Sequence, residues 1–189
     1  MGRRFFPVWV WVPLVLVIDF VSKRIVLANE EVLRAKIEII GDLLRFAYVR
    51  NPGSAMGLFP LGRTVLVSVS ILASLFLIYL FLTTDPKLRL RRAAMAAILG
   101  GALGNLVDRI FYGGFVVDFI DVGIGTHRFY TFNVADMGVS VGGALLFLCL
   151  LVEGFRDRGN STEGSVERAD DPAELIQPIQ PIEEADPNE

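Results

Sequence analysis

The sequence predicts an all-α membrane protein with four transmembrane helices and a small β platform on the extracytoplasmic side. Of its 189 residues, 53% are apolar and only 21% are charged. Four apolar stretches each approach the ~20 helical residues that cross a bilayer. Basic residues are concentrated in the segments expected on one side of the membrane. This composition excludes an ordinary water-soluble globular enzyme.

The four expected spans are residues 8–27, 64–82, 92–110 and 133–152. The second contains no charged residue and is longer than most buried helices of soluble proteins. The third and fourth are rich in Gly and Ala, which is typical of helices that pack closely in lipid. Their glycines recur at GxxxG spacing, which we interpret as helix packing rather than as a binding site.

The distribution of Lys and Arg predicts the orientation. Residues 1–7 and 83–92 hold six basic side chains in 17 residues, whereas residues 28–63 and 109–133 hold seven in 61. Basic residues favour the cytoplasmic side. We therefore expect both termini in the cytoplasm and the two longer loops outside.

The two outer loops are expected to form the β platform. Residues 44–50 mix apolar and polar side chains in the manner of a strand, and residues 115–120 and 127–130 are two further strands around a turn at Gly123 and Gly125.

Residues 154–189 differ sharply in composition from the rest of the chain. They carry ten acidic and three basic side chains and several prolines. Such a segment is too polar to bury a core. The sequence thus predicts a membrane domain over residues 1–153 and a disordered cytoplasmic tail over residues 154–189.

Several polar residues lie within the expected spans, where each ionisable group costs ~2.5–3.5 kcal/mol to insert. On the predicted topology they share the outer half of the membrane, and they are Asp19, Lys23, Asn105, Asp108, Arg109, Asn133 and Asp136. Asp19 and Lys23 are four residues apart on one helix, which predicts a structural ion pair. Arg109 follows Asp108 directly, so it faces elsewhere, toward either a lipid headgroup or a substrate carbonyl.

Two acids, Asp118 and Asp136, have no obvious cation. Asp118 is flanked by apolar residues, which should raise its pKa. Asp136 follows Asn133 by three residues, and a helix-capping box would explain that spacing without any chemistry. Two strands joined by a turn, one leading away from the membrane surface and one returning to it, could also bring Asp118 and Asp136 together to share one proton.

Such a pair could hydrolyse a peptide bond with no metal or nucleophilic side chain. The chain has one cysteine and one histidine, Cys149 and His127, too few for a zinc site. We expect no cofactor, no metal and no nucleic-acid partner.

Several segments together resemble the signature blocks of the bacterial lipoprotein signal peptidases (signal peptidase II). The blocks are Asn51-Pro52-Gly53-Ser54-Ala55-Met56-Gly57, Gly100-Gly101-Ala102-Leu103-Gly104-Asn105-Leu106-Val107-Asp108-Arg109, Val116-Val117-Asp118-Phe119 and Phe132-Asn133-Val134-Ala135-Asp136. Asp19 and Lys23 are similar to that family's first-helix Asp and Lys. Ser54 and Met56 depart from the Ala and large aromatic residue expected in the first block, which affects pocket shape rather than catalysis.

The resemblance implies a monomeric aspartic endopeptidase of the bacterial inner membrane, with its site toward the extracytoplasmic face. It would cut diacylglyceryl-modified prolipoproteins before the lipidated cysteine, and its other partners would be membrane lipids. Asp118 and Asp136 would be catalytic. The resemblance also implies a set of residues that line or support the site, namely Asn51, Gly53, Asn105, Asp108, Arg109 and Asn133.

Three alternatives remain open. A proton-coupled transporter would also carry intramembrane acids, although no inverted repeat is evident. A Ser/Lys peptidase would need Ser22 or Ser54 beside Lys23. A purely structural membrane protein would tolerate Asp118→Asn.

Overall fold

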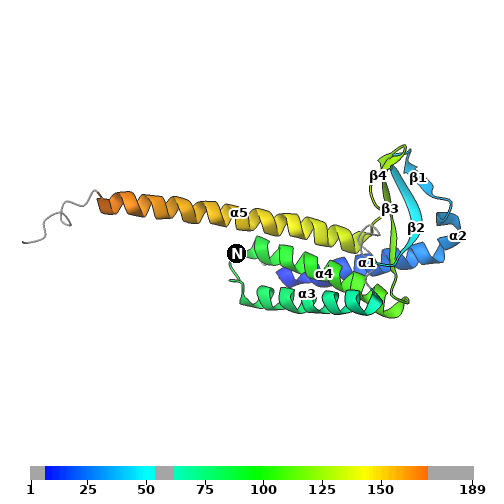
Figure 1. Cartoon of the computed structure of the whole chain (residues 1–189), viewed down its shortest axis with the longest axis horizontal. Helices are drawn as coiled ribbons and strands as arrows, with labels where there is room; N and C mark the ends of the chain where they lie inside the picture. The colour runs from blue at the N-terminus through cyan, green and yellow to red at the C-terminus, as the bar shows by residue number, and fades with distance from the viewer. Residues whose placement is uncertain (1–6, 54–61, 170–189) are drawn as a thin grey trace, which may run out of the picture. The chain divides into compact units, whose positions relative to one another are not determined.

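A computed structural model describes residues 7–53 and 62–169 of the chain. Figure 1 labels the α-helices and β-strands along the chain, and the short 3₁₀ helix η1 precedes them. The elements are η1 (Val8–Val10), α1 (Trp11–Ala28), α2 (Glu30–Leu33), β1 (Ile37–Ile40), β2 (Leu44–Asn51), α3 (Arg63–Thr83), α4 (Arg89–Phe111), β3 (Val116–Ile124), β4 (His127–Arg128) and α5 (Val134–Ala169). The protein is therefore mostly helical with a small sheet. Arg3, Arg4, Ser54, Met56 and the chain beyond residue 169 lie outside the described residues.

The chain divides into two compact units after Cys149, and α5 crosses the division. We predicted regular structure only as far as residue 153, but α5 continues to Ala169. Extending an existing helix costs much less than nucleating a new one, so the apolar part of α5 can propagate into a polar sequence.

Small residues bring the helices of the first unit into close contact, with α4 lying beside both α1 and α3 (Figure 1). A Cβ atom on Gly100 would lie 2.8 Å from the carbonyl oxygen of Val12 in α1. One on Gly101 would lie 2.2 Å from the carbonyl oxygen of Ala135 in α5. The glycine spacing in α4 therefore serves helix packing, as predicted.

Within the described residues, three helices are long and apolar enough to cross a membrane. They are Arg63–Thr83, Arg89–Phe111 and the part of α5 over Val134–Arg156. The predicted first span, residues 8–27, corresponds to η1 and α1, and α1 is not among the three. Asp19, Lys23 and Arg24 interrupt its apolar run. The expected count of four spans is therefore not established by helix length and composition.

A four-stranded antiparallel sheet lies at one end of the helices, in the order β1-β2-β3-β4 (Figure 1). In the pairing of β2 with β3, Val49 is opposite Asp118 and Asn51 is opposite Val116. Asn51 thus lies two positions along β2 from the residue opposite Asp118, close enough for its side chain to reach Asp118, although 67 positions separate the two in the chain. All three predicted strands are present, and β3 extends to Ile124, beyond the predicted turn residue Gly123.

Strand β1 was not predicted from the sequence. Its residues Ile37 to Ile40 are all exposed, so neither face of the strand is buried and the sequence shows no sustained alternation of apolar and polar residues. Its position comes from pairing with β2.

An apolar cluster joins the sheet to the end of α1. Val26 and Leu33 pack with Val117 and Phe119 of β3, and all four side chains are buried. Removing that apolar surface from water holds β3 against the helices. Asp118 therefore lies in a strand that is held in place by the buried side chains on either side of it, Val117 and Phe119.

The far end of the sheet is held by charged groups. Arg128 donates from Nε to Asp121 Oδ1 at 2.7 Å and from Nη1 to the carbonyl oxygen of Asp42 at 2.9 Å. Lys36 Nζ lies 3.4 Å from Asp121 Oδ2. This cluster connects the β1–β2 turn with β3 and β4.

The close packing of α4 with α5 predicts a stability difference between two glycines. Gly101→Ala forces a methyl group against the Ala135 carbonyl and should destabilise the protein by ~1–3 kcal/mol. Gly143→Ala in α5 meets no other described atom within 4 Å and should be neutral or stabilising by up to ~1 kcal/mol. Thermal unfolding of the two variants in detergent measures the difference. Equal melting temperatures would contradict the packing described here.

Candidate functional site

The ammonium group of Lys23 lies at the centre of a buried polar network between α1 and α4. Its Nζ is 2.8 Å from Asp19 Oδ2 and 3.0 Å from Asp108 Oδ2, and it donates to Asn105 Oδ1 at 3.0 Å. Lys23 and Asp19 are each only 1% exposed. The predicted ion pair of Asp19 with Lys23 is present, and Asp108 is a second carboxylate partner.

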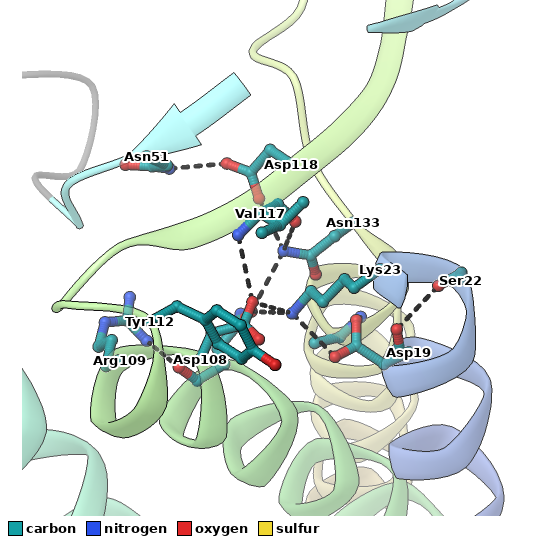
Figure 2. A network of polar contacts seen from close by, with 12 residues as sticks. Asp19, Ser22, Lys23, Asn51, Asp108, Arg109, Tyr112, Val117, Asp118 and Asn133 are labelled. Atoms are coloured by element: carbon teal, nitrogen blue, oxygen red, sulfur yellow. Dashed lines mark hydrogen bonds and ion pairs between the residues drawn. The ribbon is translucent and has the colours of Figure 1, made fainter. Parts of the chain in front are cut away.

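These carboxylates also bind the backbone of the segments that carry the other two acids. Asp19 Oδ1 accepts from the N–H of Ala135 at 2.8 Å, at the start of α5. Asp108 Oδ2 accepts from the N–H of Val117 at 3.1 Å, in β3. Figure 2 shows Lys23 reaching toward Asp19 and Asp108, with Asp118 on the strand above them. The network therefore positions β3 and α5 relative to α1 and α4.

Two asparagines extend the network toward the acids. Asn105 Nδ2 donates to Asp136 Oδ1 at 2.8 Å, while its Oδ1 accepts from Lys23 and from Asn133 Nδ2. Asn133 is fully buried, and its Nδ2 also lies 2.7 Å from Asp118 Oδ1. Asn133 thus contacts both the network and Asp118.

Asn133 and Asp136 form the capping box that their spacing predicted. The N–H of Asp136 donates to Asn133 Oδ1 at 3.0 Å, and the N–H of Asn133 donates to Asp136 Oδ2 at 3.2 Å. A capping role does not require the bond from Asn105 to the other oxygen of Asp136. Both oxygens of Asp136 accept N–H hydrogen bonds at the N-terminus of α5, a setting that stabilises a carboxylate.

Asp118 is the second carboxyl group at this site and is only 2% exposed. Asn51 Nδ2 donates to its Oδ2 at 2.8 Å, and Asn133 donates to its Oδ1. Asp118 and Asp136 therefore bind to the same residue, Asn133, one through its side chain and the other through its backbone. Burial raises the pKa of Asp118 to about 6, against hydrogen bonds from the two asparagines, and the negative charge of Asp136 adds to the rise.

The orientation of the Asn51 amide is fixed by the turn that follows β2. The N–H of Gly53 donates to Asn51 Oδ1 at 2.9 Å, so Nδ2 is the atom left to face Asp118. Gly53 has φ +86°, and a Cβ there would lie 2.6 Å from Leu66 Cδ1. Glycine is therefore favoured at this position by its backbone conformation, and a larger residue would also displace the end of the Leu66 side chain.

Arg109 borders the site from the end of α4. Its Nη1 donates to the carbonyl oxygen of Asn105 at 3.3 Å, and its Nε is buried with no hydrogen-bond partner among the described residues. Its charge lies within electrostatic range of Asp136, Asp118 and Asp108. The structure places every predicted site residue around one centre.

Sequence reasoning missed the contributions of three backbone positions. The N–H groups of Val117 and Ala135 hold the carboxylates, and no side-chain pattern reveals such a role. Gly104 has a specific function beyond helix packing, because a Cβ there would lie 2.6 Å from Asp19 Oδ2. The GxxxG pattern could have suggested close approach, but not approach to a carboxylate.

The alternative Ser/Lys arrangement does not form at Ser22. Its hydroxyl donates to the carbonyl oxygen of Asp19 at 2.9 Å, within α1. Ser54 lies outside the described residues. Across residues 7–53 and 62–169, no three His, Cys, Asp or Glu residues are grouped so that they could hold a metal ion.

Comparison with known proteins gives one consistent result. A family model described as "Signal peptidase (SPase) II" matches residues 11–152. A lipoprotein signal peptidase of Clostridium novyi (strain NT) is 46% identical over 121 residues, 63% of this chain and 80% of that protein. One of Syntrophomonas wolfei subsp. wolfei is 38% identical over 148 residues, 78% of this chain and 95% of that protein.

The fold is similar to that of a solved structure described as a bacterial membrane enzyme. The TM-score is 0.72 at 29% sequence identity, and the match covers 82% of this chain and 94% of that chain. A second structure with the same description gives a TM-score of 0.69.

The burial of Lys23 predicts a large effect of removing its charge. Lys23→Met leaves the carboxylates of Asp19 and Asp108 buried without their cation and should cost ~3–5 kcal/mol. Lys36→Met removes a half-exposed ammonium from Asp121, which keeps Arg128, and should cost less than ~1 kcal/mol. Thermal unfolding of both variants tests this ranking, and a similar loss in the two would refute it.

The raised pKa of Asp118 predicts a pH-dependent effect on stability. Between its ordinary value of 3.8 and about 6, the folded protein binds more protons at this group than the unfolded chain does. Stability is therefore lost as pH rises through this range, by up to about 3 kcal/mol. The melting temperature of Asp118→Asn relative to wild type should rise between pH 4 and pH 8.

Asp42 provides a control of opposite sign. The N–H of Gly125, with Arg45 and Arg128, lowers the pKa of Asp42. The melting temperature of Asp42→Asn relative to wild type should therefore fall as pH rises. If the relative melting temperature of Asp118→Asn also fell with pH, or did not change, the raised pKa assigned to Asp118 would be wrong.

Proposed function

Because this chain belongs to the signal peptidase II family, it is a membrane peptidase that removes signal peptides from lipoprotein precursors, and we propose that Asp118 and Asp136 are its catalytic pair. The observation that carries this proposal is the contact of both carboxyl groups with Asn133. One residue holds the two acids at one centre, although one comes from a strand and the other from a helix.

The two acids differ in their surroundings in a way that suits an aspartic peptidase. Asp118, whose pKa burial raises to about 6, is assigned the role of the acid. Asp136, which accepts N–H hydrogen bonds on both oxygens, is assigned the role of the base. Two carboxyls in unlike settings can take the roles of acid and base.

Hydrolysis then follows in two steps. Asp136 takes a proton from a water molecule whose oxygen forms a bond to the scissile carbonyl carbon, while Asp118 gives its proton to the carbonyl oxygen. In the second step the C–N bond breaks, the proton on Asp136 passes to the leaving nitrogen, and a diol proton returns to Asp118. Both acids regain their starting states.

The other polar residues would support the substrate and the pair. Asn51 and Asn105 orient the two carboxyls, and Asp108 holds β3 through Val117. Arg109 is assigned to a substrate carbonyl, because its buried Nε has no acceptor within the described part of the chain. Gly53 leaves room beside that guanidinium, with its Cβ position 3.4 Å from Arg109 Nε.

We assign α1 as a fourth span. Asp19 and Lys23 are buried against α4, so they do not face lipid. Arg24 stacks on the rings of Phe20 and Tyr112 and donates to the Tyr112 hydroxyl. The remaining outward side chains of α1, including Val17 and Ile25, are apolar and exposed. These features make α1 compatible with lipid despite its charges.

The topology proposed for this bacterial membrane protein places both termini in the cytoplasm and the sheet outside. The connection between α3 and α4, at the opposite end from the sheet, carries Lys87 and is followed by three arginines in α4. Basic residues prefer the cytoplasmic side. The site would then face the outer membrane interface, where the enzyme, acting as a monomer, would bind a diacylglyceryl-modified prolipoprotein. It would cut this substrate before the lipidated cysteine.

A proton-coupled transporter, the alternative considered for the intramembrane acids, is not supported. The family match and the relatives at 46% and 38% identity are all peptidases. Asp19, Asp108 and Asp118 lie around one centre (Figure 2), and Asp136 reaches it through Asn133.

Replacing either acid by its amide tests the catalytic assignment. Asp118→Asn and Asp136→Asn should each lower the rate of cleavage of a diacylglyceryl-modified prolipoprotein by at least about 10²–10⁴-fold, because each removes one proton-transfer role. Cleavage by the purified, reconstituted variants is followed by the shift in precursor size.

A matched control lies on the same strand. Asp121→Asn changes a buried acid of β3 that contacts Arg128 and Lys36 rather than the site, and it should retain cleavage. Near wild-type cleavage by either Asp118→Asn or Asp136→Asn, in a variant that remains folded, would exclude that acid from catalysis.

A further inference from the structure

A basic cavity lies at the end of the helices that is remote from the acids. It has a volume of about 220 Å³ and is lined by η1, the end of α3, the α3–α4 connection and the first turns of α4. Its lining residues are Pro7, Val8, Trp9, Phe81, Pro86, Arg89 and Arg92. Figure 1 shows the end of α3, the α3–α4 connection and the start of α4 together, away from the sheet.

We propose that this cavity binds the phosphate group of an anionic membrane phospholipid. The lining contains two arginines, and none of its residues, all within the described part of the chain, is acidic. Arginine is the side chain best suited to phosphate, because its planar N–H groups match the phosphate oxygens. The cavity is smaller than those that enclose a drug-sized ligand, so it fits a headgroup and not a whole lipid.

Arg92 is the residue whose geometry points most directly to an anion. Its guanidinium lies 4.3 Å from the centre of the Phe81 ring, which fixes the orientation of the planar group. Its Nε is buried and has no hydrogen-bond partner among the described residues. A phosphate oxygen would supply the acceptor that this cation lacks.

The local charge adds to this argument. The first turn of α4, which is fully described, contains no acidic residue, and the nearby acid Asp85 accepts from the N–H of Lys87 at 2.8 Å. Basic side chains at a helix N-terminus oppose the helix dipole. Basic pockets between membrane helices recognise anionic headgroups.

The position of the cavity favours a lipid over a soluble ion. It lies where two membrane-spanning helices end, at Thr83 and Arg89, the depth at which lipid phosphates are found. Trp9 forms part of its wall and is 57% exposed, as expected for an aromatic ring at the membrane interface. The acyl chains of a lipid held there would continue along the apolar helix surfaces.

Fluorescence of Trp9 tests the proposal in the full chain. The sequence has two tryptophans, so Trp11→Phe leaves Trp9 as the only one. The protein is placed in phosphatidylcholine nanodiscs, and phosphatidylglycerol with brominated acyl chains is added as quencher. We expect saturable quenching by this lipid at low mole fraction and only weak, linear quenching by brominated phosphatidylcholine.

Charge variants separate a defined site from general surface attraction. Arg92→Gln should raise the half-saturating fraction of phosphatidylglycerol about five-fold, and Arg92→Lys should give a smaller rise. Lys87→Gln removes the same charge close by in sequence but does not line the cavity, so it should shift the curve much less. Retained prolipoprotein cleavage confirms that each variant is folded.

Three results would overturn the proposal. Equal shifts in Lys87→Gln and in both Arg92 variants would show diffuse attraction instead of a site. Equal quenching by the two brominated lipids would show that the headgroup is not recognised. Displacement of phosphatidylglycerol by millimolar inorganic phosphate would assign the cavity to a free ion.

Discussion

The buried ammonium group of Lys23 is the constraint on which the site depends. A charge removed from water must be paired and hydrogen-bonded, and Lys23 satisfies this through Asp19, Asp108 and Asn105. The two carboxylates are then held so that their oxygens reach the backbone of α5 and β3. The ion pair is thus less a source of stability than a means of setting the geometry of the two segments that carry Asp118 and Asp136.

That geometry gives two carboxyl groups different environments within one centre. Asp118 lies in a strand whose neighbours Val117 and Phe119 are part of the apolar cluster, so burial acts on it directly. Asp136 lies at the start of a helix, where N–H groups reach both of its oxygens. Asn133 contacts both acids, and the capping box that fixes its amide is therefore part of the site as well as of the helix.

The sequence predicted those features that depend on local spacing. Apolar runs located α3, α4 and α5, the four-residue spacing located the ion pair of Asp19 with Lys23, and the three-residue spacing located the capping box. It could not show that Asn105 bridges Lys23 and Asp136, because that contact depends on how separate helices pack. Strand β1 was missed because its four residues are all exposed and leave no periodic pattern, and the continuation of α5 was missed because its sequence is polar.

The most direct test of the account is an experimental structure with a peptide analogue that carries a hydroxyl group in place of the scissile carbonyl. The account predicts that this hydroxyl lies within about 2.5–3.2 Å of a carboxyl oxygen of Asp118 and of one of Asp136, with Asn133 still in contact with both acids. A hydroxyl bound by only one of the two, or carboxyl groups that face away from each other around an occupied site, would contradict the account.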